Sequence, residues 1–298
     1  MSEKLNQLKS ELSHHVVGQE RVIERLIVSM LAGGHCLLEG VPGVGKTMMT
    51  STLARMVGGS FTRIQFTPDL LPADIVGTRI YRASREAFDI ELGPVFSNFV
   101  LADEINRAPA KVQSALLEVM AEKQVSIGGV TNKVPQPFMV LATQNPIEQE
   151  GVYMLPEAQR DRFLMRVPVD YPTLAEESEI ARRSSSPIGE PRQIVTLDEL
   201  RELQTVAQAM PVPDAVADYA VRLVMATREP RRYGFDSLDG WLSFGASPRA
   251  TLGLLSAGRA LSLMRGRTTV RVQDIYDIAY DVLNHRLVLS WDAVTRGA

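Results

Sequence analysis

The segment GVPGVGKT, residues 40–47, constrains the fold of this chain more than any other part of the sequence. It follows the apolar run CLLE and opens TMMTSTLARMV, a pattern compatible with a helix. A G-x-x-x-x-G-K-[ST] segment between a strand and a helix is typical of a phosphate-binding loop. Its glycines let backbone amides surround phosphate oxygens, and the helix N-terminus favours bound anions. A glycine-rich turn with an incidental lysine is the alternative, and the flanking patterns argue against it.

Two side chains of this loop are expected to contact a bound nucleotide directly. Lys46 should reach the β- and γ-phosphates of ATP, and Thr47 should ligate Mg²⁺. The residues expected to surround the nucleotide here are Gly40, Val41, Pro42, Gly43, Val44, Gly45, Lys46, Thr47 and Met48.

Two later apolar runs end in polar side chains. FVLADEI contains Asp103 and Glu104, and FMVLATQNP leads to Asn145. Ligands bind at the carboxyl ends of parallel strands, so we expect Asp103 to hold Mg²⁺ through water and Glu104 to act as general base. A solvated turn is the alternative, but an aspartate closing a buried run is costly without a nearby cation. Asn145 could hydrogen-bond the γ-phosphate, although an ordinary Asn-Pro turn also accounts for it.

Short apolar runs alternate with helical patterns between residues 35 and 170. Runs that are apolar at nearly every position are typical of strands buried on both faces of a parallel sheet, with helices as crossovers. The expected strands are 35–40, 61–66, 99–105, 138–144 and 163–169. Between the second and third, TRIYR and FDIEL flank a polar turn, which predicts an inserted hairpin. The sequence therefore predicts an α/β fold with a parallel sheet and a hairpin insertion of the kind that is usually functional.

The strand signal stops after about residue 172. Helical patterns follow at 173–185, 196–210, 213–229, 247–266 and 271–288, and the breaker cluster SSSPIGEP at 184–191 predicts an exposed loop. We therefore expect two domains: an α/β domain over residues 1–172 and a helical domain over residues 173–298.

Charge and composition argue against several classes of protein. The net charge is −3, whereas domains that bind nucleic acid usually run strongly basic. One cysteine allows no internal disulfide, and four scattered histidines suggest no metal-binding cluster. The polar start MSEKLNQLKSELSHH lacks the apolar core of a signal peptide, and no apolar run approaches the roughly 18–20 residues of a membrane span. We expect a cytoplasmic protein with no membrane span.

With these motifs in order, the sequence resembles an AAA+ ATPase and is similar to the MoxR family. The resemblance runs from VVGQERVIERLIVSMLAGGHCLLEGVPGVGKT through LADEINRAPAKVQSALLEVMAEKQVSIGG and VLATQNPIEQEG. It continues in LPEAQRDRFLMRV, GASPRATLGLLSAGRALSLMRGR and DVLNHRLVL. It implies a P-loop AAA+ core with the hairpin insertion above, a second hairpin in EKQVSIGGVTNKVPQPF, and an all-α lid domain.

The family's motifs assign further expected roles to individual residues. The segment expected to lie against adenine is Val17, Gly18 and Gln19. Arg249, in GASPR, matches a second sensor that contacts the nucleotide from the lid. Arg162, in DRF, matches an arginine finger that enters the ATP site of the next copy in a ring, which the family suggests is a hexamer. The residues expected to act in catalysis are Lys46, Glu104, Asn145, Arg162 and Arg249, and the metal ligands are Thr47 and Asp103.

One departure from the family pattern concerns the finger. Members commonly carry an apolar residue where this chain has Arg160, so two guanidinium groups flank Asp161. We expect Arg162 to be the finger because it keeps its place beside Phe163, and Arg160 to pair with Asp161 or with an acidic group on a neighbour. Such a pair contributes little if it is exposed.

The resemblance implies an ATP-driven chaperone that remodels, matures or inserts metal into client proteins. Members are associated with partners bearing von Willebrand factor A domains, which here would be a separate polypeptide. The alternative is the ATPase subunit of a magnesium chelatase, which shares the core and hairpins. A DNA motor and a scaffold that rarely hydrolyses are further alternatives. The net negative charge argues against the DNA motor. The presence of the expected catalytic residues Glu104, Asn145 and Arg162 argues against the scaffold.

Overall fold

The computed structural model describes residues 2–84, 86–146, 152–183 and 189–297. At its centre is a parallel sheet of five strands in the order β2-β5-β8-β1-β9. The strands are β1 (Cys36–Gly40), β2 (Phe61–Gln65), β5 (Phe99–Asp103), β8 (Met139–Gln144) and β9 (Met165–Val169). All four pairings are parallel, so the predicted parallel α/β core is confirmed.

Helices cover both faces of this sheet because its strands bury alternate residues on opposite sides. Leu38 and Leu101 belong to one apolar cluster, with α1 (Ser2–His15), α2 (Glu20–Leu31) and α3 (Lys46–Met56). Leu37 and Val100, their neighbours in sequence, belong to the other cluster, with α4 (Pro72–Val76) and α5 (Ala110–Glu122). A two-residue period with both faces apolar explains the continuous apolar runs of the sequence.

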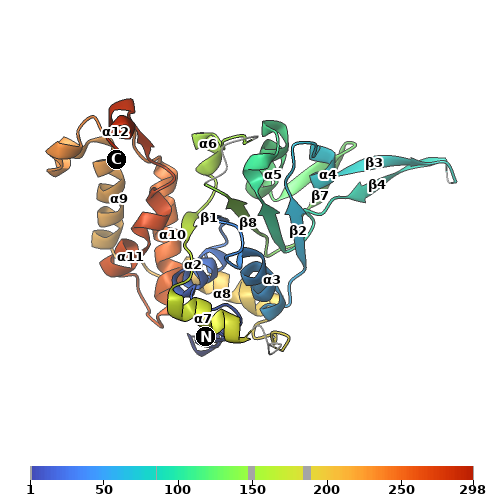
Figure 1. The fold of residues 1–298 in the computed structure, drawn as a ribbon, viewed down its shortest axis with the longest axis horizontal. Helices are drawn as coiled ribbons and strands as arrows, with labels where there is room; N and C mark the ends of the chain where they lie inside the picture. The colour runs from blue at the N-terminus through green and yellow to red at the C-terminus, as the bar shows by residue number, and fades with distance from the viewer. Residues whose placement is uncertain (1, 85, 147–151, 184–188, 298) are drawn as a thin grey trace.

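Two antiparallel hairpins leave this core, as predicted. The first pairs β3 (Gly77–Arg82) with β4 (Ala87–Leu92), and the second pairs β6 (Gln124–Ile127) with β7 (Val130–Lys133). The β3–β4 hairpin projects far from the body of the molecule, at the right of Figure 1. Part of its expected polar turn, Arg85, lies outside the described residues.

The rest of the chain is mostly helical. Its elements are α6 (Glu157–Arg160), α7 (Leu174–Arg183), α8 (Leu197–Ala209), α9 (Asp214–Arg228), α10 (Pro248–Met264), α11 (Val272–Leu283) and α12 (Trp291–Thr295), with 3-10 turns at Ile105–Arg107, Pro230–Tyr233 and Asp236–Leu238. Helices α9 to α12, which fall within the lid domain predicted at 173–298, gather beside the core (Figure 1); the boundary at residue 172 stays a prediction. Residues 184–188 of the expected loop lie outside the described residues. No helix of the described ranges is both long and apolar enough to cross a membrane.

Two observations modify the expected picture of the helical part. A short antiparallel pair, β10 (Leu242–Phe244) with β11 (Val288–Leu289), contradicts the expectation that no strand follows residue 172. Strands of two or three residues are too short to show an alternating pattern. In addition, one buried cluster joins Leu200 of α8 and Leu254 of α10 to Leu26 of α2, so the lid side and the core share apolar packing.

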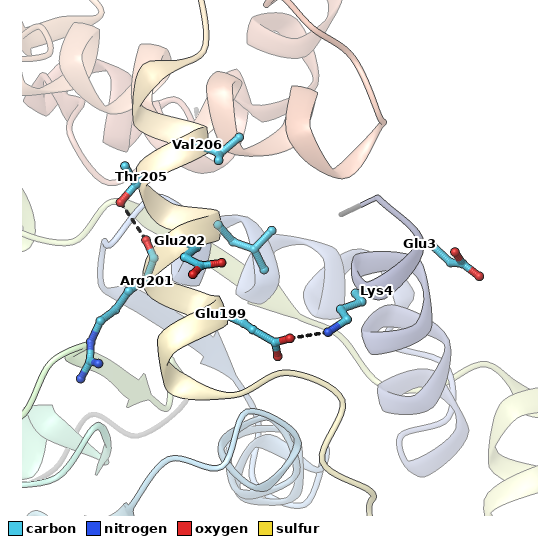
Figure 2. A pocket seen from close by; sticks show the side chains of 8 residues that line it. Glu3, Lys4, Glu199, Arg201, Glu202, Thr205 and Val206 are labelled. Carbon is cyan, nitrogen blue, oxygen red and sulfur yellow. Dashed lines mark hydrogen bonds and ion pairs between the residues drawn. The ribbon is translucent and has the colours of Figure 1, made fainter.

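A buried charge pair also joins the lid to the core. Arg25 Nε of α2 donates to Asp281 Oδ2 of α11 at 2.7 Å, and both side chains are buried. Arg21 donates to the same carboxylate. Removing one partner of a buried pair is strongly destabilising because it leaves the other charge uncompensated. Elsewhere, Lys4 of α1 reaches Glu199 of α8 beside a surface cavity of about 710 Å³, shown in Figure 2.

Candidate active site

The carboxyl ends of four sheet strands surround one cavity. Its volume is about 450 Å³. It is lined by Pro42, Gly43, Gly45, Lys46, Thr47, Met48, Arg63, Asp103, Glu104 and Asn145. The structure thus brings together most of the expected phosphate, metal and catalytic residues, which lie at or just after the carboxyl ends of β1, β5 and β8. Arg63 of β2 is an addition to which the sequence analysis gave no role. Gly40 and Val41 are not in the lining, since Val41 packs into the apolar core.

The loop between β1 and α3 has the backbone that its glycines permit. Gly43 and Gly45 have φ of 85° and 80°, a region in which residues with a Cβ are disfavoured. Gly45 precedes the first residue of α3, Lys46, whose Nζ donates to the carbonyl oxygen of Gly40 at 2.6 Å. Burial lowers the pKa of Lys46, and the charges of Asp103 and Glu104 oppose this shift. The ammonium therefore lies between the loop and the two carboxylates.

Both oxygens of the Asp103 carboxylate have partners. Thr143 Oγ1 of β8 donates to Oδ1 at 2.6 Å. Arg63 donates to Oδ2 from Nε at 3.0 Å and from Nη2 at 2.6 Å. Asp103 itself is 9% exposed, and a nearly buried carboxylate needs a cation. Arg63 supplies that charge here, and the expected role of Asp103 in holding Mg²⁺ stays a prediction.

Glu104 is held in a strained backbone conformation. Its φ is 55° and its ψ is 51°, which costs of order 1–3 kcal/mol for a residue other than glycine. The Glu104 N–H donates to Thr143 Oγ1 at 2.8 Å. Its Oε2 accepts from Gln65 Nε2 at 3.1 Å and pairs with Arg107 Nε at 2.9 Å. Three groups thus fix the Glu104 main chain and carboxylate at the cavity. Gln65 could be found only by knowing that β2 pairs with β5.

A second cavity of about 290 Å³ adjoins the first, because Gly43, Gly45 and Met48 line both. Its other lining residues are His15, Val16, Val17, Gln19, Val44, Pro172, Ile180 and Arg183. Two of the three residues expected against adenine are therefore in this apolar cavity. Gly18, the third, has φ of 76°, so the chain turns there in a conformation that favours glycine.

Arg162 lies at the opposite edge of the sheet. Leu164 N donates to His35 O at 2.8 Å, which places Arg162 just before the amino ends of β9 and β1. Its Nη1 donates to Leu117 O of α5 at 2.8 Å. Arg162 is exposed and lines neither cavity of its own chain.

Arg249 lies at this amino edge as well. Its Nη1 is 3.6 Å from Asp161 Oδ2, and its side chain is 60% exposed. It lines neither cavity. The structure therefore separates the two expected catalytic arginines from the other expected site residues of the same chain, and it brings the arginines to a common edge.

Of the two expected pairings of Arg160, the one with Asp161 is wrong, and the one with an acidic group on a neighbouring copy stays a prediction. Arg160 Nη2 lies 3.6 Å from Glu157 Oε1, one turn earlier in α6. Asp161 is instead engaged by Ser247, Arg249 and Arg286 of the lid. Residues at i and i+3 of a helix are neighbours, so Glu157 competes locally for Arg160, whereas Asp161 turns to the lid.

The strand order, the phosphate loop and the adjacent carboxylates define a P-loop ATPase of the AAA type. The family described as "ATPase family associated with various cellular activities (AAA)" matches residues 35–165, and the AAA lid domain matches residues 241–297. The chain belongs to the MoxR family of AAA ATPases. Members of the AAA class hydrolyse ATP, which they bind with Mg²⁺.

Individual relatives are similar over three quarters or more of their own length. The chaperone MoxR1 of Mycobacterium tuberculosis (strain ATCC 25618 / H37Rv) is 57% identical over 95% of this chain and 75% of its own length. Protein MoxR of Paracoccus denitrificans is 34% identical over 95% of this chain and 88% of its own. A crystal structure of a putative ATPase from Cytophaga hutchinsonii superposes with a TM-score of 0.94, at 45% identity, over 100% of this chain and 91% of its own.

Proposed function

We propose that this chain is a Mg²⁺-dependent ATPase whose active site is shared between two copies. The first copy supplies the nucleotide cavities at the carboxyl edge of its sheet. The second copy supplies Arg162 and Arg249 from the amino edge of its sheet. The observation that carries this proposal is that neither arginine lines a cavity of its own chain.

Within one copy, the carboxyl-edge residues have separable roles. Lys46 binds the β- and γ-phosphates, and Glu104 accepts the proton of the attacking water. Asn145 orients that water or contacts the γ-phosphate. Thr47 and Asp103 would hold Mg²⁺, which neutralises phosphate charge when bound; a hydroxyl and a carboxylate, oxygen donors of the kind that Mg²⁺ prefers, line the same cavity and fit such a site.

The two arginines act on the neighbour because they are too far from their own site. A five-residue strand spans roughly 13–17 Å, and the phosphate loop and Arg162 are at its opposite ends. A guanidinium offers two donors to the charge that develops on the γ-phosphate. Arg249 acts on the same neighbouring copy as Arg162, because Arg249 contacts Asp161 and Asp161 directly precedes Arg162. Head-to-tail contacts of this kind close into rings, and a hexamer is the expected number of copies.

The proposed cellular role is that of a chaperone acting on client proteins. This role is supported by 57% identity to a relative named a chaperone. The projecting β3–β4 hairpin would transmit nucleotide-dependent motion to the client (Figure 1). A von Willebrand factor A domain protein is the expected separate partner, and the cytoplasm the expected compartment.

Phosphate release by the purified protein with Mg²⁺ and ATP tests the enzymatic part of the proposal. Lys46→Ala should lose nucleotide binding. Glu104→Gln should bind ATP and release phosphate very slowly, because an amide cannot accept the proton. Glu118→Gln, an exposed carboxylate of α5 outside both cavities, is the matched control and should hydrolyse normally. Wild-type turnover by Glu104→Gln would overturn the assignment.

A further inference from the structure

Asp161 joins the two proposed trans-acting arginines through one carboxylate. Its Oδ1 accepts from Arg286 Nε at 2.8 Å, and its Oδ2 accepts from Ser247 Oγ at 2.8 Å. The same Oδ2 lies 3.6 Å from Arg249 Nη1. Ser247 is the N-cap of α10, and Arg249 is the second residue of that helix. Asp161 therefore fixes the start of the helix that carries Arg249.

The same carboxylate borders the segment that carries Arg162. Phe163, on its other side, is fully buried, and its carbonyl oxygen accepts from Arg286 Nη2 at 2.7 Å and from His285 Nε2 at 3.0 Å. Arg162 is thus held between two anchored neighbours while its own side chain is exposed. The distance between the Arg162 and Arg249 main chains is consequently set by Asp161 and Arg286.

Arg286 is suited to a fixed anchor because it is buried and fully engaged. Its side chain is 3% exposed. Besides Asp161 and Phe163, it donates to Leu164 O at 3.2 Å and to Val282 O. Burial lowers the pKa of this guanidinium, and Asp161 opposes the shift. A planar fork with this many fixed acceptors restricts rotation of the carboxylate that it binds.

We propose that Asp161, held by Arg286, is a positioning residue that sets Arg162 and Arg249 at one spacing, so that both reach the neighbour's ATP together. This inference rests on the proposed shared site. Misplacement of a catalytic group by about 1 Å can cost about 10²-fold in rate. Loss of the Asp161 carboxylate should therefore lower turnover without weakening ATP binding.

Mixing two inactive variants separates positioning from a general structural role. Asp161→Asn copies keep intact cavities but offer misplaced arginines, so alone they should turn over about 10–10²-fold more slowly than the wild type. Glu104→Gln copies cannot hydrolyse ATP but offer well-placed arginines. Mixed assemblies should therefore exceed the summed activity of the two proteins measured separately. A variant whose core is damaged would gain nothing from such a neighbour.

Asp281→Asn is the matched control. Asp281 also forms a buried lid–core pair, but it contacts neither Arg162 nor Arg249. Its folded fraction should keep near-wild-type turnover and show no rescue with Glu104→Gln. If Asp161→Asn is not obtained as folded protein, Ser247→Ala removes one of the same contacts and should show a smaller loss with the same rescue.

The Arg162→Ala and Glu104→Gln mixture serves as the reference. Recovery in both mixtures supports the positioning role. Recovery with Arg162→Ala but not with a folded Asp161→Asn or Ser247→Ala protein overturns the positioning role alone. Recovery in neither mixture overturns the shared site, and this inference falls with it.

Discussion

The carboxyl edge of the central sheet gathers its functional side chains from short sequence motifs, whereas the amino edge is assembled by contacts between distant residues. At the carboxyl edge, Asp103 and Glu104 are adjacent and the phosphate loop is continuous. At the amino edge, Asp161 contacts Ser247 and Arg286, which are 86 and 125 positions away in the chain. One edge is therefore defined by local sequence, and the other depends on how the lid packs.

This difference suggests a division of labour between copies. The carboxyl edge has two adjoining cavities and paired charges, which suits ligand binding. The amino edge presents two exposed arginines on an anchored base, which suits insertion into another molecule. Variants at the two edges should accordingly fail in different ways.

The largest expected effect is at the amino edge. Arg162→Ala should lower kcat by about 10³–10⁵-fold, the range for loss of an arginine finger, with ATP affinity unchanged. Arg162→Lys should recover little, because an ammonium lacks the two-donor fork. Steady-state phosphate release and calorimetric ATP binding measure the two quantities.

Arg160→Ala is the control for this variant, since Arg160 pairs within α6 and lies two positions away in the sequence. It should change kcat little. The reverse pattern, with Arg160 essential and Arg162 dispensable, would assign the finger to Arg160.

At the carboxyl edge, Glu104→Gln should lower kcat by about 10²–10⁴-fold, the usual contribution of a general base. ATP binding should persist because Lys46 and the loop are intact. The two edges are distinguished by a mixture with wild-type copies: Glu104→Gln should silence only its own cavity, and Arg162→Ala only its neighbour's. If single-turnover measurements showed that both variants silence the same cavity, the two edges would not act in different copies.

The buried ion pair between Arg25 of the core and Asp281 of the lid should affect stability more than ATP turnover. Asp281→Asn removes one of the two carboxylates that pair with buried Arg25, and Glu24 remains, so the free energy of unfolding should fall by about 3 kcal/mol, the low end of the range for a broken buried pair. Urea unfolding monitored by fluorescence measures the change. A loss well below about 1 kcal/mol would mean that apolar packing alone holds the lid.

The smallest expected effect concerns acid stability of the amino edge. His35 Nδ1 accepts from Val140 N at 3.0 Å, so the neutral ring carries its proton on Nε2, near Met120 O. Burial lowers the pKa of His35 from 6.5 to about 4. The stability that the neutral ring contributes is complete above pH 6.5 and is lost as the pH falls through about 4. The total loss in the free energy of unfolding is at most about 3 kcal/mol.

Urea unfolding at pH 7.5 and pH 4.5 tests this dependence. The fall in unfolding free energy between these pH values should be smaller in His35→Asn than in the wild type. His14→Asn, an exposed histidine of α1, is the control and should behave as the wild type does. An equal fall in His35→Asn would show that this ring does not limit acid stability.

The sheet and the phosphate site were predictable from the sequence because each depends on local patterns. Strands buried on both faces are continuously apolar; Asp103 and Asn145 close or follow such runs, and Lys46 belongs to the glycine-rich motif after one. Gln65 and Arg63 were not predictable, since their contacts depend on β2 lying beside β5. Helix α1 was missed although Leu5, Leu8 and Leu12 are buried at a spacing that marks one helical face.

The contacts between the lid and the core could not be predicted from the sequence. Arg162 and Arg249 were assigned by resemblance alone, and nothing in the chain near Asp161 indicates Arg286 as its partner. Long-range ion pairs leave no periodic signal in a single sequence. The incorrect pairing of Arg160 with Asp161 arose for this reason, because only the folded chain shows that the lid engages that carboxylate.

The most direct measurement of the shared site is phosphate release across mixing ratios of Arg162→Ala and Glu104→Gln proteins. Each variant alone is nearly inactive, but an Arg162→Ala cavity beside a Glu104→Gln neighbour has every required group. With random assembly through head-to-tail contacts, an equal mixture should reach about one quarter of wild-type turnover per chain. Activity that stays at the sum of the separate variants at every ratio, under conditions where the copies exchange, would contradict the account.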